Sequence, residues 1–229
     1  MDITPAIISL KTTLAATFIT FILGLWAAWY VANYNGKLKG LIDSILTLPL
    51  VLPPIVAGFA LLVFFGAQGP FDGILKSLHT RIIFTWASTV IAATVVSFPL
   101  MYRTTRSAFE QIDKNVMNAA KTLGVSNSRI FFHIVIPLAW PGIAAATVLT
   151  FARALGEFGA TVMVSGNIPG VTQTMPISIY FAIQSGDMKT ASIWVVVIFL
   201  ISVIVMTIMN YWTQIQTKIQ QPFSNKTEV

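Results

Sequence analysis

The chain has 229 residues, of which 55% are hydrophobic and 10% are charged. With a mean hydropathy of +0.78, this composition excludes a soluble globular protein, because too few polar side chains are present to cover its surface. There is no cysteine, which excludes disulfides, thiolate metal sites and thiol nucleophiles.

Five apolar stretches are long enough, or nearly so, to cross a bilayer core, which takes about 20 helical residues. They cover residues 10–34, 51–67, 82–102, 138–164 and 192–212. The first is too long for the core of a signal peptide and follows Asp2 rather than a basic cluster, so it is interpreted as a retained span. The stretch 174–185 is too short to span and is predicted to form an interfacial or re-entrant helix. The sequence therefore predicts an all-α integral membrane protein, a polytopic bundle of about five transmembrane helices, with a single domain over residues 1–229.

Two of the predicted spans contain residues that interrupt helices. Pro49, Pro53 and Pro54 flank or interrupt the second span. They either open a cavity-lining segment or produce a plain kink that packing accommodates. The fourth span would be about 40 Å long as one helix, so a bend is predicted at Gly156 and Gly159. Close helix contacts are predicted at three further glycines, Gly24, Gly58 and Gly142, although none forms a G-x-x-x-G pair.

The distribution of lysine and arginine predicts the orientation in the membrane. One set of loops and the tail carry nine cations, namely Lys37, Lys39, Arg103, Arg106, Lys114, Lys121, Arg129, Lys218 and Lys226. The other set carries four, namely Lys11, Lys76, Arg81 and Lys189. We therefore place the C-terminus and the loop 103–133 in the cytoplasm and the N-terminus outside. The cations lie between apolar runs and not along one face, so no nucleic acid partner is predicted.

The cytoplasmic loop 113–137 is predicted to form a hairpin of short helices. A helix from Asp113 is stopped at Gly124, and Ser126 can cap a second helix through 128–134. Pro137 lies near the start of the next span. The small and apolar side chains of the hairpin are Ala119, Ala120, Leu123, Ile130, Phe131 and Phe132. By chemistry alone, such a hairpin either docks in the groove of a partner or lies as an amphipathic linker on the membrane surface.

The spacing of this hairpin resembles the EAA loop of ABC importer permeases, E-A-A-x(3)-G-x(9)-I-x-L-P. The matching residues are Ala119, Ala120, Gly124, Ile134 and Pro137. Asn118 stands where the family has Glu, and Ile136 where it has Leu. The loss of the Glu charge means that any ion pair with the ATPase is absent or replaced by an amide hydrogen bond.

The resemblance implies a type I importer in which this hairpin is the coupling helix that fits a cleft of a cytoplasmic ATPase subunit. The residues expected at that contact are Asn118, Ala119, Ala120, Leu123, Gly124, Phe131 and Pro137. It further implies a homodimer with a second permease copy, two ATPase subunits and an extracellular or periplasmic binding protein. The expected location is the bacterial inner membrane, as a multi-pass protein surrounded by lipid.

The chain contains no G-x-x-x-x-G-K-[S/T] phosphate-binding loop. We therefore predict that it is not an enzyme and binds no cofactor, and that ATP and magnesium are bound by the partner ATPase. His79 and His133 are isolated loop histidines, so no metal site is predicted.

Further segments bear on the cargo. Residues 48–58 and 151–174 resemble the permeases of oxyanion importers, and those for molybdate most closely. Sulfate and tungstate permeases share part of these sequence motifs, so sulfate and tungstate are the alternative cargoes. A rival of another class is an ATP-independent secondary carrier, which inverted repeats or several intramembrane carboxylates would favour, and neither is evident.

Polar residues around the fourth span are the candidates for a translocation path or gate. Arg153 and Glu157 are four residues apart and can pair on one helical face. They are either path or hinge groups or a self-neutralising structural pair. The hydroxyls of Thr161 and Ser165 and the amide of Asn167 can serve an anion without trapping it, or can bond their own backbone or a neighbouring helix.

Overall fold

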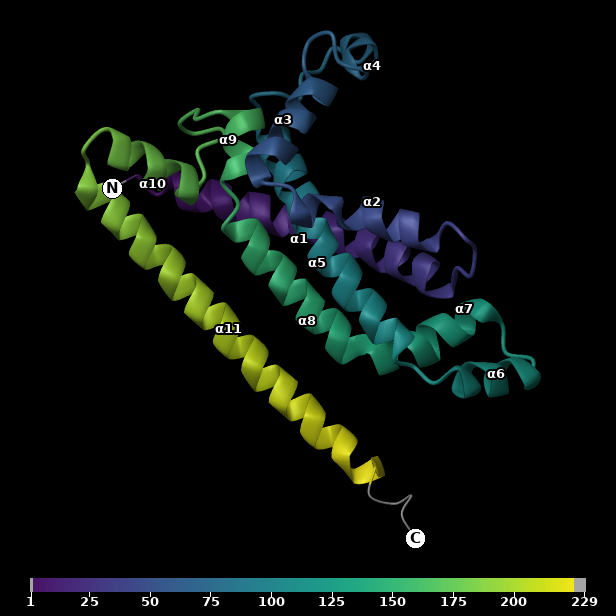
Figure 1. The fold of residues 1–229 in the computed structure, drawn as a ribbon. Coiled ribbons are helices and arrows are strands. Elements are labelled where there is room, and N and C mark those ends of the chain that lie inside the picture. Colours follow the sequence, from purple (N-terminus) through teal and green to yellow (C-terminus); the bar gives the residue numbers. More distant parts are fainter. Residues whose placement is uncertain (1, 225–229) are drawn as a thin grey trace.

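The structure is a computed structural model that describes residues 2–224, without the side chains of residues 209–210 and 212–224. Lys226 and the side chain of Lys218, which the charge count places in the cytoplasm, lie outside this description. The described residues form helices and no strand (Figure 1). The helices are α1 (Thr4–Asn33), α2 (Lys39–Val51), α3 (Pro54–Phe65), α4 (Asp72–Ser77), α5 (Trp86–Glu110), α6 (Lys114–Thr122), α7 (Asn127–Ile130), the π-helix η1 (Phe131–Val135), α8 (Ile136–Leu155), α9 (Gly159–Ser165), α10 (Met175–Gln184) and α11 (Met188–Ser224).

Three helices, α1, α5 and α8, pack on one another at the centre of the molecule. Helices α1 and α5 run parallel, since Thr12 and Thr89 share a hydrogen bond of 3.0 Å between their hydroxyls and Gly24 faces Met101 at the same offset. Small residues recur at every fourth position along this face of α1, namely Thr12, Ala16, Thr20, Gly24 and Ala28, and all are buried. Such residues let two helix backbones approach closely, which is how helices associate in a membrane.

Another face of α1 carries large side chains at the same spacing. Leu10, Leu14, Phe18, Ile22, Trp26 and Tyr30 are all exposed. The rings of Trp26, Tyr30 and Tyr34 stack at the C-terminal end of the helix, with centroids about 6 Å apart. Exposed apolar side chains that end in aromatic rings are typical of a surface that faces lipid and reaches the membrane interface.

The predicted second span is broken, as its prolines indicated. Helices α2 and α3 meet at an angle of 110° across Leu52 and Pro53. Pro54 opens α3, where its missing N–H costs no hydrogen bond.

By length and hydropathy, three helical stretches between residues 2 and 224 are able to cross a membrane, or four if the bent pair counts as one span. Five were predicted. The difference includes α5, which is 25 residues long but buries polar side chains such as Ser88, Thr89 and Ser97 inside the bundle. Its length suits a span, while its average hydropathy is lowered by these internal groups.

The fourth span, predicted over residues 138–164, begins and ends earlier in the structure, at Asn127 and Leu155. Residues Asn127–Leu155 form one helical rod through α7, η1 and α8, so the predicted separate helix over 128–134 is wrong. The wide turn of η1 lies just before Pro137, which has no N–H to donate and whose ring would crowd the preceding turn of a regular helix. The rod ends at Gly156, which confirms the predicted bend.

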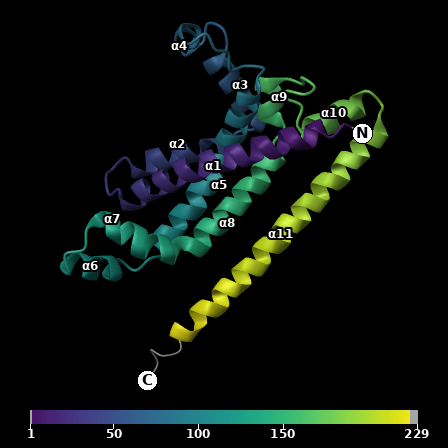
Figure 2. The ribbon, with the colours of Figure 1, turned by 180° about the vertical axis from the view of Figure 1, so that it is seen from behind.

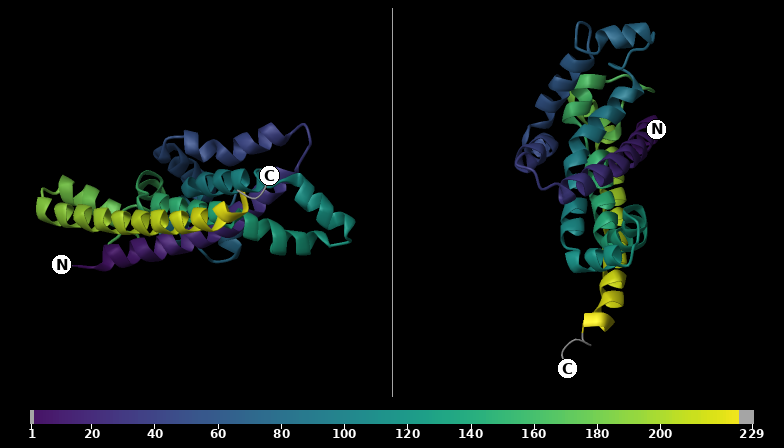
Figure 3. Two further views of the ribbon diagram at one scale, coloured as in Figure 1. Left: turned by 90° about the horizontal axis from the view of Figure 1, so that it is seen from below. Right: turned by 90° about the vertical axis from the view of Figure 1, so that its right-hand side faces the viewer.

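Helices α10 and α11 complete the described part of the chain, and both contact the central helices. Helix α10 has 10 residues, which confirms that this segment is too short to span. Helix α11 runs back past α8 and diverges from the bundle toward its C-terminus (Figures 1 and 2). The N-terminus and the α6–α7 hairpin lie at opposite ends of the molecule (Figure 3).

Candidate functional site

The α6–α7 hairpin is built by strong local signals at both ends of α6. The Asp113 carboxylate accepts the N–H of Asn115 at 2.8 Å and so caps the start of the helix. At the other end, Gly124 has a φ of +76°, and its N–H and that of Val125 donate to the carbonyls of Lys121 and Ala120 at 3.0 and 3.1 Å. This left-handed termination satisfies the last carbonyls of α6 and reverses the chain.

The tip of the hairpin is open to its surroundings. The Leu123 side chain is 83% exposed, and Asn118, Ala119 and Gly124 are exposed as well. Phe132, on the second arm, is 65% exposed. The hairpin therefore presents small, polar and apolar groups on a defined backbone, away from the bundle.

Other hairpin residues that were expected on this surface are turned inward. Phe131 lies with its ring centroid 4.8 Å from that of Trp29, and Ile130 and Ala120 are buried in the same apolar cluster. These side chains fix the hairpin to the bundle. Ser126 precedes α7 but makes no side-chain cap hydrogen bond, so that prediction is wrong. Pro137 is exposed.

At a distance from the hairpin, the two broken rods touch each other. Helix α3 follows the break at Pro53, helix α9 follows the break at Gly156, and the two pack together. Gly58 approaches so closely that a Cβ there would lie 2.7 Å from both Cα and the carbonyl oxygen of Ala160. Interrupted helices are tolerated in a membrane where they are buried in protein or line a cavity. We name this contact between α3 and α9 the gate contact, after the path or gate that the sequence predicts around the fourth span.

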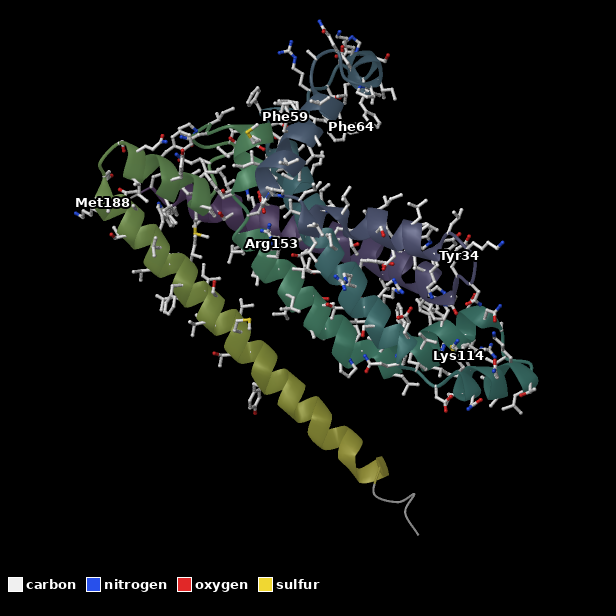
Figure 4. All side chains as sticks on the ribbon, viewed as in Figure 1. Tyr34, Phe59, Phe64, Lys114, Arg153 and Met188 are labelled. Atoms are coloured by element: carbon white, nitrogen blue, oxygen red, sulfur yellow. The ribbon has the colours of Figure 1, made fainter. Side chains whose placement is uncertain are left out.

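Arg153 and Glu157 are paired at this break, as their spacing predicts. Arg153 Nη1 lies 2.7 Å from Glu157 Oε2, while Glu157 Oε1 accepts the N–H of Ala160 at 2.8 Å. The Glu157 side chain is 2% exposed and that of Arg153 is 29% exposed. Glu157 thus ties the end of α8 to the first turn of α9. Figure 4 shows Arg153 near the middle of the molecule, with Tyr34 and Lys114 toward the hairpin and Met188 at the other end.

Replacing Glu157 by glutamine is expected to lower the free energy of unfolding by about 1–3 kcal/mol, because it leaves the Arg153 charge without its partner. The double variant Arg153→Gln, Glu157→Gln is expected to regain part of this loss, since no unpaired charge remains. Thermal unfolding of the purified protein in detergent measures both. A double variant less stable than the single one would contradict this account.

The other predicted path residues lie beside the same break. Thr161 and Ser165 are buried, and the Ser165 hydroxyl shares a hydrogen bond of 2.8 Å with Ser88 of α5. Asn167 Oδ1 is buried without a hydrogen-bond partner among residues 2–224. Ser88 had no distinguishing sequence signal, because its partner lies 77 positions away. The role of these residues in a path stays a prediction.

At the end of the molecule away from the hairpin, an open cleft of about 1230 Å³ lies between α3, α4 and the segment 79–85 that precedes α5. Lys76, His79 and Arg81 line it. Hydrogen bonds from Lys76 and from the N–H of Gln68 lower the pKa of Asp72 below its ordinary value. Gln68, His79 and Phe84 have positive φ angles, so this segment is held in a shape that costs conformational energy.

The sequence matches the family model described as "Binding-protein-dependent transport system inner membrane component" over residues 20–216. It is 42% identical over 200 residues to a putative molybdenum transport system permease protein of Bacillus subtilis, covering 87% of this chain and 88% of that protein. It is 45% identical over 181 residues to the molybdenum transport system permease protein of Escherichia coli, with 78% and 79% covered. A probable sulfate transport system permease protein of Chlorokybus atmophyticus is 34% identical over 205 residues, with 90% and 72% covered.

Solved structures share the fold at low sequence identity. A chain of the MetNI methionine ABC transporter in an inward-facing conformation superposes with a TM-score of 0.70 at 16% identity, covering 92% of this chain and 93% of that one. A chain of a bacterial alginate ABC transporter, in complex with its pentasaccharide-bound periplasmic protein, gives a TM-score of 0.71 at 16% identity, with 93% and 80% covered.

Proposed function

This chain belongs to the family of binding-protein-dependent transport system inner membrane components, and we propose that it is the permease subunit that carries molybdate in an ATP-driven importer. The observation that carries this proposal is the hairpin 113–137, whose tip is exposed, on a bundle of apolar helices. The cargo is inferred from relatives with 42% and 45% identity that are named molybdenum permeases.

The proposed assembly contains two copies of this chain, two cytoplasmic ATPase subunits that bind ATP and magnesium, and a binding protein outside. Each hairpin would sit in a cleft of one ATPase subunit. The cations at the hairpin end, including Lys37, Lys114 and Lys121, support a cytoplasmic location for that end, in line with the positive-inside rule. The binding protein would then meet the opposite end, where the cleft lined by Lys76 and Arg81 opens.

The chemistry of the path suits an anion that must be released. Arg153 is neutralised by Glu157, so the break offers no free cation that would hold a dianion tightly. Hydroxyl and amide groups beside it can donate hydrogen bonds, which are exchanged readily. Selectivity would therefore reside mainly in the binding protein, and ATP-driven closure of the ATPase pair would move the hairpins and switch the side to which the path opens.

The chain reconstituted in vesicles with its ATPase is expected to take up labelled molybdate when ATP and binding protein are both present. Deleting residues 114–133 is expected to abolish uptake, because the contact with the ATPase is lost. Uptake that survives this deletion, or that needs no ATP, would contradict the proposal and favour a secondary carrier.

Sulfate and tungstate are the alternative cargoes, since a sulfate permease is 34% identical to this chain. Competition of labelled molybdate uptake by unlabelled sulfate and tungstate separates them. We expect sulfate to compete weakly. Sulfate that competes as well as molybdate would reassign the cargo.

A further inference from the structure

A cluster of charged and polar side chains joins α2 to the C-terminal end of α5. Asp43 Oδ1 accepts hydrogen bonds from the Tyr102 hydroxyl at 2.8 Å and from Arg106 Nη1. Arg106 Nε donates to Glu110 at 2.9 Å, and Lys39 Nζ lies 3.5 Å from the same carboxylate oxygen. We name these five residues the α2–α5 latch. None of them was singled out for this contact by the sequence.

The latch is more than a pair of solvated surface charges. Tyr102 is fully buried, and the Arg106 side chain is 19% exposed. Arg106 contacts two carboxylates and a hydroxyl at once. Such a network fixes the positions of its side chains more firmly than an isolated ion pair does. Helix α2 itself has no fully buried residue, so its apolar packing on the bundle is partial and the latch supplies its specific attachment.

The position of the latch connects the hairpin to the gate contact. Three residues beyond the latch residue Glu110, Asp113 caps α6, so α5 supports the hairpin directly. Helix α2 leads through Pro53 into α3, which forms one side of the gate contact. The other side, α9, follows the rod Asn127–Leu155, which begins in the hairpin.

Both sides of the gate contact are therefore supported from the hairpin, but in different ways. Helix α9 is supported by a rod that is covalently continuous with the hairpin. Helix α3 is supported through α2. Helix α2 leads back to α1 and not to the hairpin, but the latch joins it to α5, the helix that supports the hairpin. Without the latch, α2 would be held to α5 only by its partial apolar packing, so α3 would follow a displacement of the hairpin less closely than α9 would.

We propose that Asp43 is a positioning residue that holds α2 to α5, so that a displacement of the hairpin moves α3 together with α9. This inference rests on the proposed function, since it concerns the coupling of ATP hydrolysis to transport. It assigns no contact with the cargo or with ATP to Asp43.

In the reconstituted importer, Asp43→Asn and Asp43→Ala are expected to retain ATP hydrolysis but to lower the amount of oxyanion taken up per ATP at least about fivefold, as for a lost allosteric coupling. Lys39→Gln, which removes only the 3.5 Å contact, is expected to change this ratio by less than about twofold. Ser44→Ala, next to Asp43 on the same helix, removes only the hydrogen bond from the Ser44 hydroxyl to the Gly40 carbonyl; it is the matched control and is expected to leave the ratio unchanged. Asp43 variants with an unchanged ratio, or with hydrolysis and uptake reduced in proportion, would overturn the proposal.

A rescue experiment separates positioning from general stability. Because the chain has no cysteine, Lys39→Cys and Glu110→Cys introduce a unique pair across the latch. A reversible thiol crosslinker that spans this gap is expected to restore uptake per ATP in the Asp43→Ala background, and a reductant is expected to abolish the rescue. Crosslinking without rescue would overturn the proposal.

A distance measurement tests the latch without any cargo. Spin labels at the exposed positions Phe59 on α3 and Ile168 after α9 report the gate contact in the assembled permease. We expect Asp43→Ala to broaden their distance distribution when nucleotide is added. An unchanged distribution would overturn the latch, whereas failure of the parent chain to take up oxyanion would overturn only the proposed function.

Discussion

Replacing Gly124 by proline is expected to leave the apolar helices inserted in the membrane while transport falls to background. Two features of the hairpin cause this. Proline holds φ near −65°, whereas Gly124 has a φ of +76°. Proline also lacks the N–H that donates to the Lys121 carbonyl at 3.0 Å. The termination of α6 cannot form, and the exposed tip with Leu123 loses its fixed shape.

A graded series at the same position separates these causes. Gly124→Asn is expected to retain most transport, because asparagine tolerates the left-handed region. Gly124→Ala is expected to cost about 1–2 kcal/mol of local conformational energy, with no clash, since no atom lies within 4 Å of the added Cβ. Transport activity and copurification of the ATPase subunit measure the order Asn, Ala, Pro. Normal transport in Gly124→Pro would count against the role of the hairpin in coupling.

The hairpin was predictable where its signals are local. Gly124 acts on residues within a few positions as a left-handed stop, and the structure confirms that prediction. The helix was predicted to start from Asp113, and the structure shows that this residue caps it. The same holds for the break at Gly156, where the length of the apolar run exceeded a single span. Signals of this kind depend on one segment of the chain and are visible in its sequence.

The inward orientation of Phe131 was not predictable in this way. An aromatic residue on an amphipathic loop suits either a partner or the bundle. Its orientation is decided by Trp29 and Phe109, which lie about 100 and 20 positions earlier in the chain. Likewise, Pro137 suggested the start of a helix. In the structure, the π-helix η1 before it lets one continuous helix run on from the hairpin.

One tertiary contact did leave a sequence signal. Small residues at Thr12, Ala16, Thr20, Gly24 and Ala28 mark the face of α1 that packs on α5. A search for glycine pairs alone misses it, because threonine and alanine supply most positions. The α2–α5 latch left no comparable signal, since Asp43 lies 59 and 63 positions from Tyr102 and Arg106.

The replacement Gly58→Ala is expected to disrupt the gate contact and to reduce transport strongly. The added Cβ would lie 2.7 Å from Cα and the carbonyl oxygen of Ala160 and 2.9 Å from Met163 Cβ. Overpacking of this kind costs about 1–3 kcal/mol. Helix α3 must therefore shift away from α9, while the hairpin, at a distance, keeps the shape that we propose the ATPase subunit binds. Uptake and ATP hydrolysis in vesicles, with thermal unfolding in detergent, measure these effects.

Gly40→Ala is the matched control on α2, because no atom lies within 4 Å of the added Cβ. It is expected to leave transport unchanged and to stabilise α2 by up to about 1 kcal/mol. If Gly58→Ala keeps the transport and stability of the parent chain, the distance between α3 and α9 at the gate contact is larger than in the structure.

The identity of the opposing atoms predicts which glycine variants can be repaired. A Cβ at Gly142 would lie 2.5 Å from the Cβ of Ala108, a side-chain atom, so Ala108→Gly is expected to restore the stability of Gly142→Ala. At Gly58 the nearest atoms belong to the backbone of Ala160, so Ala160→Gly removes nothing that clashes with them and is expected not to restore transport. Repair of Gly58→Ala by Ala160→Gly would mean that side chains, and not the two backbones, set the distance between α3 and α9.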